Sequence, residues 1–237
     1  MKYWYPLILL LLALPLKGRA QDLEYRMELG GGLGTCFYTG DANSSPFRHP
    51  SVMGGVIARR ILNPRMVVKG DLAFGHVYGN SSGIFIPNDA TSLTPEGGQL
   101  TKVHFKRNLL DLGAQFEFNF WGYGLGGGYK GHSPLTPYAT AGLGFTLAMG
   151  GGTNANLALN APIGVGVKYK LKPRLNVGAE WTMRFTTTDK LDVSGEYPQL
   201  NHPYGIESTG FKNKDCYSFL MFFVTYDLSP KYRQCNN

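Results

Sequence analysis

The stretch of sequence that decides the fold is residues 108–120, which read NLLDLGAQFEFNF. Every second residue from Leu110 to Phe120 is apolar, and most of the residues between them are polar or small. In a strand these two sets face opposite sides. A strand of a soluble sandwich shows the same alternation, but usually over about 5–6 residues. The length of this segment instead matches a transmembrane strand, which takes about 9–11 residues with one face in lipid.

The same alternation recurs in five further segments, and in each of them the lipid-facing phase can be read directly. These segments are residues 25–33, 66–74, 137–147, 161–171 and 175–185. Ser51–Leu62 and Cys216–Leu228 also read as strands, with facing that the pattern leaves open. The total is about eight, the smallest even number of strands in such barrels. The sequence therefore predicts an all-β protein, a small closed antiparallel transmembrane β-barrel.

The connections between these segments alternate in length. Short links are expected at Asn63-Pro64, around residues 122–134 and at Lys172-Pro173, and longer polar loops at roughly 39–50, 79–105, 150–156 and 189–215. Outer-membrane barrels have short periplasmic turns and longer extracellular loops. We therefore expect the short links and both chain ends on the periplasmic side of a cell outer membrane.

The first residues read as a cleaved signal peptide. Lys2 precedes the apolar run Leu7–Leu16, and Gly18-Arg19-Ala20 supplies small residues at the two cleavage positions. The run is roughly half of the ~20 apolar residues that a spanning helix needs. We expect residues 1–20 to be the signal peptide, 21–228 the barrel and 229–237 a periplasmic tail.

Composition supports membrane strands and gives no sign of a nucleic-acid partner. The chain has 32 Gly, 14 Tyr and 14 Phe among 237 residues, and only 16% of its residues are charged. This composition suits short strands joined by tight turns. Loss of the three basic residues of the signal peptide lowers the net charge from +7 to +4. That charge is too small and too scattered to indicate nucleic acid.

Charged residues in the inward phase predict a charge network inside the barrel. An eight-stranded barrel has an interior only wide enough for side chains to fill. Acidic and basic residues are nearly matched, so they can pair and avoid the cost of unpaired buried charge. The alternative is a path for a charged solute. The inward residues are Arg26, Glu28, Lys69, Asp71, Arg107, Asp111, Glu117, Lys168, Lys170, Glu180 and Arg184.

No pattern in the sequence indicates a catalytic, cofactor or metal site. The five histidines, at positions 49, 76, 104, 132 and 202, lack metal-ligand spacing. Residues 122–127 match a dinucleotide-binding string, but they follow a membrane strand and open no helix. His132-Ser133 lies between Gly131 and Pro134 with no nearby acid to orient the histidine, so a turn is favoured over a hydrolase site. We therefore expect no enzyme activity and no cofactor.

Two stretches resemble the PorG-like outer-membrane barrels of the Bacteroidota type IX secretion system. One is the start of the barrel, Glu28-Leu-Gly-Gly-Gly-Leu-Gly-Thr followed by Tyr38-Thr-Gly-Asp41. The other is the final strand, Asn213-Lys-Asp-Cys-Tyr-Ser218 running into Thr225-Tyr-Asp-Leu228. The resemblance follows the strand order along essentially the whole chain after residue 20. It brings no catalytic residues with it.

The resemblance implies an accessory that anchors, rather than a translocon. PorG-like barrels are thought to fix a periplasmic ring of PorK-like and PorN-like proteins to the outer membrane, so the implied partners are those ring proteins and outer-membrane lipids. One alternative is a stand-alone structural or adhesive barrel whose extracellular loops bind ligands. A lipid-modifying enzyme or a small porin is a third reading. Since a fold alone does not determine a function, the ranking of these readings depends on the resemblance.

The three cysteines belong to a chain exported to an oxidising compartment, where disulfides can form between them or with a partner. Cys36 ends the first strand and Cys216 begins the last, so the two lie near the same rim once the barrel closes. Whether they bond depends on the facing of the last strand. The chain from Cys216 to Leu228 runs about 40 Å along a strand, so Cys235 cannot reach either of them. We hypothesise that Cys235 instead forms a disulfide with a periplasmic partner; the alternative is an unused thiol in a disordered chain end.

Overall fold

The computed structural model describes residues 24–39, 47, 49–87, 98–124, 132–152, 154–188, 191 and 215–231. Eight long strands form the barrel, and two short strands lie in one of its links. The long strands are β1 (Glu24–Thr39), β2 (Ser51–Asn63), β3 (Met66–Pro87), β4 (Gly98–Asn119), β7 (Leu135–Met149), β8 (Asn156–Lys172), β9 (Leu175–Thr186) and β10 (Cys216–Lys231). The short strands are β5 (Gly122–Tyr123) and β6 (His132–Ser133).

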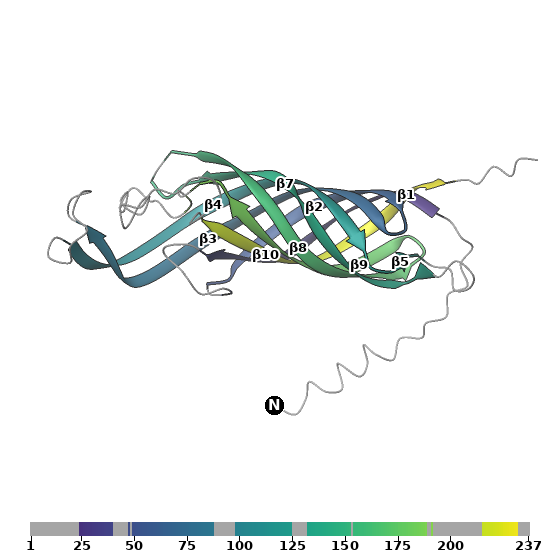
Figure 1. The fold of residues 1–237 in the computed structure, drawn as a ribbon, viewed down its shortest axis with the longest axis horizontal. Coiled ribbons are helices and arrows are strands. Elements are labelled where there is room, and N and C mark those ends of the chain that lie inside the picture. The colour runs from purple at the N-terminus through teal and green to yellow at the C-terminus, as the bar shows by residue number, and fades with distance from the viewer. Residues whose placement is uncertain are drawn as a thin grey trace, which may run out of the picture.

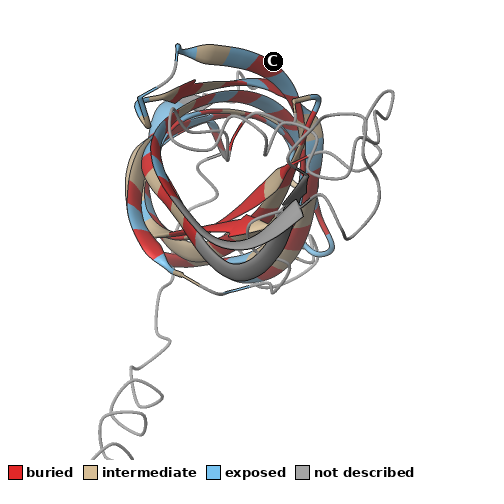
Figure 2. Ribbon diagram, turned by 90° about the vertical axis from the view of Figure 1, so that its left-hand side faces the viewer, coloured by how far each residue is buried: buried red, intermediate tan, exposed pale blue. Residues whose placement is uncertain are grey.

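The eight long strands close into one antiparallel barrel in the order β1-β10-β9-β8-β7-β4-β3-β2. Figure 2 shows the closed ring in cross-section. The first and last strands pair along their whole length, from Glu24 opposite Lys231 to Thr39 opposite Cys216. The predicted eight-stranded antiparallel barrel is therefore confirmed. The predicted signal peptide, residues 1–20, lies outside the described residues.

We call the two ends of the barrel the turn end and the loop end. The turn end carries the short links β2–β3, β4–β7 and β8–β9, together with the first and last described residues of the barrel. The loop end carries the other four connections. The last strand runs three residues beyond the predicted Leu228, to Lys231.

The lipid-facing and inward phases predicted for β4, β7, β8 and β9 are confirmed. In β4, for example, Asp111, Gln115 and Glu117 are buried whereas Leu112 and Phe116 are exposed. Alternating buried and exposed residues run along the strands in Figure 2. Because the buried members of this alternation are polar, the core of this barrel is largely a polar lumen.

The outer face carries an apolar belt of large exposed side chains. Seven of the eight strands contribute to it, with Leu33, Val56, Leu72, Leu112, Leu143, Ile163 and Phe222 as examples. Soluble monomers rarely expose apolar patches above a few hundred Å². A closed barrel satisfies every backbone ladder internally, which is the condition for crossing hydrocarbon with strands. The chain is therefore a transmembrane β-barrel.

Among the described residues, no helix is long and apolar enough to cross a bilayer.

The seam between β1 and β10 combines small and large residues. The inward side chains of β10 include the apolar Phe219, Met221 and Phe223, all buried. Facing them, β1 carries glycine, and a Cβ built on Gly32 would lie 2.8 Å from Met221 Cγ. A side chain at position 32 of β1 would collide with the inward-facing side chain of Met221 on β10. The glycine-rich start of the barrel thus makes room for the large side chains of its last strand.

The segment 79–105, expected as a long polar loop, is largely strand instead. β3 and β4 continue as a two-stranded ribbon to the pair Pro87 and Gly98, with a register shift between Ser82 and Ile84. The ribbon extends beyond the other strands at the loop end (Figure 1). Gly79 and its polar neighbours suggested a loop, but Ile84, a β-branched residue of the kind that strands favour, lies within the paired segment.

The β4–β7 link folds back onto the turn end. Tyr123 N donates to Pro64 O at 3.0 Å, and Gly124 N donates to Ser133 O at 3.0 Å. β5 and β6 pair in parallel within this link. Figure 1 places β5 at the end of the barrel opposite the projecting ribbon. The described part of the link, residues 120–124 and 132–134, therefore packs against the turn end of the barrel.

Candidate functional site

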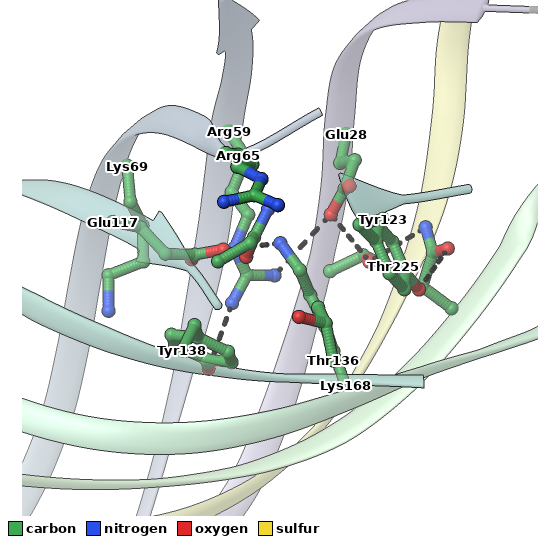
Figure 3. Close-up of polar contacts among 12 residues, drawn as sticks. Glu28, Arg59, Arg65, Lys69, Glu117, Tyr123, Thr136, Tyr138, Lys168 and Thr225 are labelled. Carbon is green, nitrogen blue, oxygen red and sulfur yellow. Dashed lines mark hydrogen bonds and ion pairs between the residues drawn. The ribbon is translucent and has the colours of Figure 1, made fainter. Parts of the chain in front are cut away.

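The lumen is occupied by three groups of charged side chains, of which the largest surrounds Arg59. This Arg59 cluster consists of the cations Arg59, Lys69 and Lys168, the carboxylates Glu28, Glu117 and Glu180, and the hydroxyl of Tyr138. Arg59 Nε donates to Glu117 Oε2 at 2.9 Å, and Glu117 also receives Lys168. Figure 3 shows Arg59 and Lys168 converging on Glu117.

The remaining carboxylates of the Arg59 cluster are also engaged. Lys69 Nζ lies 2.6 Å from Glu180 Oε1, and Tyr138 donates to Glu180 Oε2 at 2.7 Å. Glu28 Oε2 lies 3.6 Å from Arg59 Nη1 and accepts from Thr225 at 3.3 Å. Three cations face three carboxylates, so the cluster is balanced in charge. Such balance offsets the desolvation that an unpaired buried charge would suffer.

A second cluster surrounds Arg184, on the loop side of the first. Its guanidinium contacts two carboxylates, Asp111 Oδ1 at 2.8 Å and Asp71 Oδ2 at 2.9 Å. Neutral groups supply the other donors: Gln115 to Asp71 at 2.5 Å, and Tyr217 to Asp111 at 2.5 Å. We call Arg184, Asp71, Asp111, Gln115, Tyr217 and Asn160, which donates to Asp111 at 2.7 Å, the Arg184 cluster.

The third group lies at the turn end, beneath the β4–β7 link. Lys170 Nζ lies 2.5 Å from Asp227 Oδ2, and Asn176 donates to Asp227 Oδ1 at 2.6 Å. Tyr123 of β5 donates to Asn176 at 2.8 Å, and its ring lies 5.1 Å from Lys170 Nζ. The link thus inserts an aromatic side chain over the charged interior at this end.

Polar contacts also tie the loop end together. Tyr38 donates to Asp215 at 2.5 Å, and Asp215 accepts the backbone N–H of Leu191 at 2.9 Å. Arg107 donates to the carbonyl oxygens of Ala148 and Asn154, at 3.3 and 3.1 Å. Charged and aromatic side chains therefore continue to this rim of the barrel.

Between the two large clusters lies a cavity of only about 10 Å³, lined by residues that include Met53, Asp71, Glu180, Arg184 and Phe219. A cavity of this size holds about one water molecule. The side chains on either side of this cavity are held by ion pairs. The lumen is therefore a packed polar core.

Ten of the eleven residues predicted to face the lumen lie buried inside the barrel, and Arg26 is a correction. The ten are Glu28, Lys69, Asp71, Arg107, Asp111, Glu117, Lys168, Lys170, Glu180 and Arg184. Arg26 shares the inward phase but is exposed. It lies near the turn-end terminus of β1, where a long side chain can extend into water and avoid desolvation.

Sequence reasoning missed two central members of these groups, Arg59 and Asp227. Both lie on strands whose facing the alternation left open, β2 and β10. In β2 the pair Gly54-Gly55 interrupts the pattern, and in β10 the residues Phe219 to Phe223 are apolar in both phases. The available signal was charge matching, because the inward residues of the other strands left carboxylates for Arg59 to pair with.

The candidate rim disulfide between Cys36 and Cys216 is not formed. Cys36 is a buried free thiol. The register sets Cys36 opposite Phe219 and Cys216 opposite Thr39, three residues away along the seam. Three residues of strand span about 10 Å, beyond the reach of a disulfide, and the odd offset turns the two side chains to opposite faces. Cys235 lies outside the described residues.

The residues of the β4–β7 link that match catalytic or cofactor-binding motifs make ordinary structural contacts. Ser133 Oγ donates to Leu135 O at 2.7 Å, and Gly122-Tyr123 forms β5 rather than opening a helix. Within the described ranges, no group of three or more His, Cys, Asp or Glu side chains could hold a metal ion. Among the described residues, the arrangement of the lumen offers ion pairing.

Comparison with solved structures finds several small barrels of similar shape. Neisserial surface protein A is 12% identical, with a TM-score of 0.49, and covers 85% of this chain and 97% of its own. The attachment invasion locus protein Ail of Yersinia pestis is 11% identical, with a TM-score of 0.47, covering 87% and 100%. The N-terminal barrel domain of Pseudomonas aeruginosa OprF is 14% identical, with a TM-score of 0.41, covering 86% and 98%.

Sequence comparison gives one family. Among curated proteins, no sequence matches this chain. A family described as a domain of unknown function, DUF6089, matches residues 5–237, which is nearly the whole chain. The chain therefore belongs to the DUF6089 family.

Proposed function

We propose that this chain is a non-enzymatic outer-membrane barrel that acts as an accessory, anchoring component of the type IX protein secretion system. In this role it tethers a periplasmic ring to the outer membrane. The observation that carries the proposal is the packed lumen, in which the Arg59 and Arg184 clusters leave a cavity of about 10 Å³ between them. A barrel whose interior is filled by side chains would act through its surfaces.

The buried ion pairs support an anchor over a channel. Opening a path would require the separation of contacts such as Lys69–Glu180 at 2.6 Å and Arg184–Asp111 at 2.8 Å. Each separation would leave charge unpaired in a dehydrated interior, which is costly. The turn end is additionally covered by Tyr123, whose hydroxyl bonds Asn176. The apolar belt holds the barrel in the bilayer, and the two ends remain for partners.

The secretion system itself is proposed from sequence resemblance. The glycine-rich stretch from Glu28 to Thr35 and the final strand resemble PorG-like barrels, whose implied partners are PorK-like and PorN-like ring proteins. With short turns facing the periplasm, as in other outer-membrane barrels, the turn end and the tail after β10 would meet such a ring. We further propose that Cys235 in that tail forms a disulfide with a ring protein.

Crosslinking and pull-down from solubilised outer membranes test the anchoring role. We expect PorK-like and PorN-like proteins to be recovered with the wild-type barrel. Non-reducing gels of wild type and Cys235→Ser test the disulfide separately, with Cys216→Ser as the matched control. An adduct that persists in Cys235→Ser rejects the disulfide, and the absence of any ring component after crosslinking rejects the anchoring role.

Conductance in planar bilayers tests the closed lumen on which the proposal depends. The purified barrel should show no steady large conductance, because side chains fill the interior of an eight-stranded barrel. Stable channels at the nanosiemens scale would reject the anchor and support a porin.

A second candidate function is a stand-alone adhesive barrel, and one observation favours it. The β3–β4 ribbon carries paired backbone out to Pro87 and Gly98, past the ends of the neighbouring strands. A projecting ribbon is suited to present a binding surface outside the membrane. Shortening the ribbon between Gly79 and Phe105 discriminates the two roles. Loss of surface attachment with the ring proteins still captured would favour adhesion.

A further inference from the structure

We propose that the turn end of the barrel carries a binding surface for anionic phospholipid headgroups. The first observation concerns charge. Every acidic side chain that the structure describes is buried, namely Glu28, Asp71, Asp111, Glu117, Glu180, Asp215 and Asp227. Six described basic side chains are exposed, namely Arg26, Arg60, Arg65, Lys106, Lys172 and Arg174. Over the described side chains, the exposed charge is therefore entirely cationic.

Five of these six cations lie at or near the turn end, and we call them the basic collar: Arg26, Arg60, Arg65, Lys172 and Arg174. They belong to β1, β2, the β2–β3 turn, β8 and the β8–β9 turn. In the barrel order these elements, with β10, form one continuous arc. On the remaining arc of the turn end, where β4 joins β7, the exposed residues are instead apolar, namely Phe120, Trp121 and Leu135.

The collar adjoins the lower edge of the apolar belt. Arg60 pairs in register with Met27 on one side and Val68 on the other, and those two residues are 44% and 42% exposed. A guanidinium among lipid-facing side chains extends its apolar stem along them and places its charge at the headgroup level. The phosphates of the adjoining leaflet are the anions found at that level.

Arg174 of the collar is held by two tyrosine side chains. Its Nε donates to Tyr25 OH at 3.0 Å and its Nη1 donates to Tyr226 OH at 3.4 Å. The guanidinium also stacks over the Tyr25 ring at 5.4 Å. The hydroxyls fix its position without neutralising its charge, and a guanidinium has five N–H donors in all. An immobilised guanidinium suits a phosphate, which it can bind through two parallel hydrogen bonds.

The arrangement favours a membrane over an acidic protein as the partner. The collar follows the circumference of the barrel beside the belt that lipid already covers, and it continues that interface into the headgroup layer. Anionic lipid surfaces attract basic residues next to a membrane segment. The inference depends on the barrel spanning a bilayer and is independent of the proposed secretion role.

Lipid retention measures this preference. The full barrel is placed in nanodiscs of dioleoyl phosphatidylglycerol and dioleoyl phosphatidylethanolamine in equal amounts, and the lipids that remain bound are counted by native mass spectrometry. We expect wild type to retain the anionic lipid several-fold over the zwitterionic one. In Arg60→Gln/Arg65→Gln/Arg174→Gln the ratio should fall close to one. Lys106→Gln, which removes the exposed cation on the loop side, should retain the wild-type ratio.

Two further arms separate a headgroup site from a structural role. Raising the salt concentration should lower the wild-type ratio, because screening weakens exposed charge interactions. Arg174→Gln alone should lower it partly while the heat-modifiable folded band on a gel stays intact, so the test holds even if the triple variant fails to fold. Equal retention of both lipids by wild type, or an unchanged ratio in a folded Arg174→Gln, overturns the proposal. Equal retention together with capture of an acidic protein would assign the collar to that protein instead.

Discussion

The two large clusters in the lumen stabilise their buried carboxylates by different means. The Arg59 cluster matches three cations to three carboxylates, whereas the Arg184 cluster has one cation for two carboxylates. In the second cluster Gln115, Asn160 and Tyr217 donate the hydrogen bonds that further cations would have provided. Neutral donors can therefore take over part of the stabilisation of a buried carboxylate, and the dependence on each remaining cation rises accordingly.

Arg184→Met should cause the largest loss. The substitution leaves Asp71 and Asp111 with neutral donors only, and removing one partner of a buried ion pair costs about 3–5 kcal/mol. Urea unfolding of the barrel in lipid vesicles, followed by tryptophan fluorescence, measures the free energy of unfolding. Lys69→Met is the matched control, because Glu180 keeps a cation, Arg59 Nη2 at 3.9 Å, as well as Tyr138 as a donor at 2.7 Å. Equal losses in the two variants would remove the distinction between the clusters.

Glu117→Gln should come next, at roughly 3 kcal/mol, because Arg59 and Lys168 both lose their closest carboxylate. Glu28→Gln removes a looser contact, 3.6 Å from Arg59 Nη1, and should cost less in the same unfolding experiment. If Glu28→Gln proves the more damaging, charge balance over the whole cluster matters more than the short contacts.

The tyrosine hydroxyls sharpen the comparison at a smaller scale. Tyr217→Phe removes a donor to Asp111, and Tyr138→Phe removes a donor to Glu180. Hydrogen bonds to charged groups contribute about 1.5–3 kcal/mol. Tyr217→Phe should lie in that range, because Asp111 shares its cation, Arg184, with Asp71. Tyr138→Phe should lie below it, because Glu180 has Lys69 at 2.6 Å and Arg59 at 3.9 Å. The reverse order in urea would show that neutral donors are not the essential support of the Arg184 cluster.

Arg26→Gln should have the smallest effect on stability, within about 0.5 kcal/mol, because exposed substitutions away from buried networks rarely exceed that. The measurement is the same urea midpoint, with Glu28→Gln on the same strand as the comparison. A loss comparable to that of Glu28→Gln would place Arg26 functionally inside the network.

The sequence predicted the architecture and the facing of most strands because alternation is a direct consequence of the two-residue period of a strand. The prediction failed where the two faces of a strand did not differ in polarity. In β10, Phe222 and Phe223 face opposite sides, the first exposed and the second buried. The inward Phe223 is stabilised by the Arg59 guanidinium 4.5 Å from its ring centroid, a contact from another strand that β10 alone cannot reveal.

The contacts within the lumen could not be predicted without knowing how the strands pair around the barrel. Cys36 and Cys216 are neighbours in the sense that their strands pair, but a difference of three residues in register separates them. The charge network could be assigned from phase alone, whereas its pairing could not: Arg59 of β2 meets Glu117 of β4 across the interior, between strands that do not pair. Depth along the barrel decides these contacts, and it depends on the stagger of all eight strands.

The glycines of β1 have a consequence for how the barrel is closed. Gly30, Gly32 and Gly34 present no side chain to β10, so in the middle of the seam β1 contributes no inward side-chain contacts that specify the native alignment over one slipped by two residues. Glycine-rich strands specify their pairing weakly. The alignment must then be selected at the two ends, by Glu28 with Thr225 and by Tyr38 with Asp215. Mispaired closure is therefore an assembly error open to this chain, and these two polar contacts oppose it.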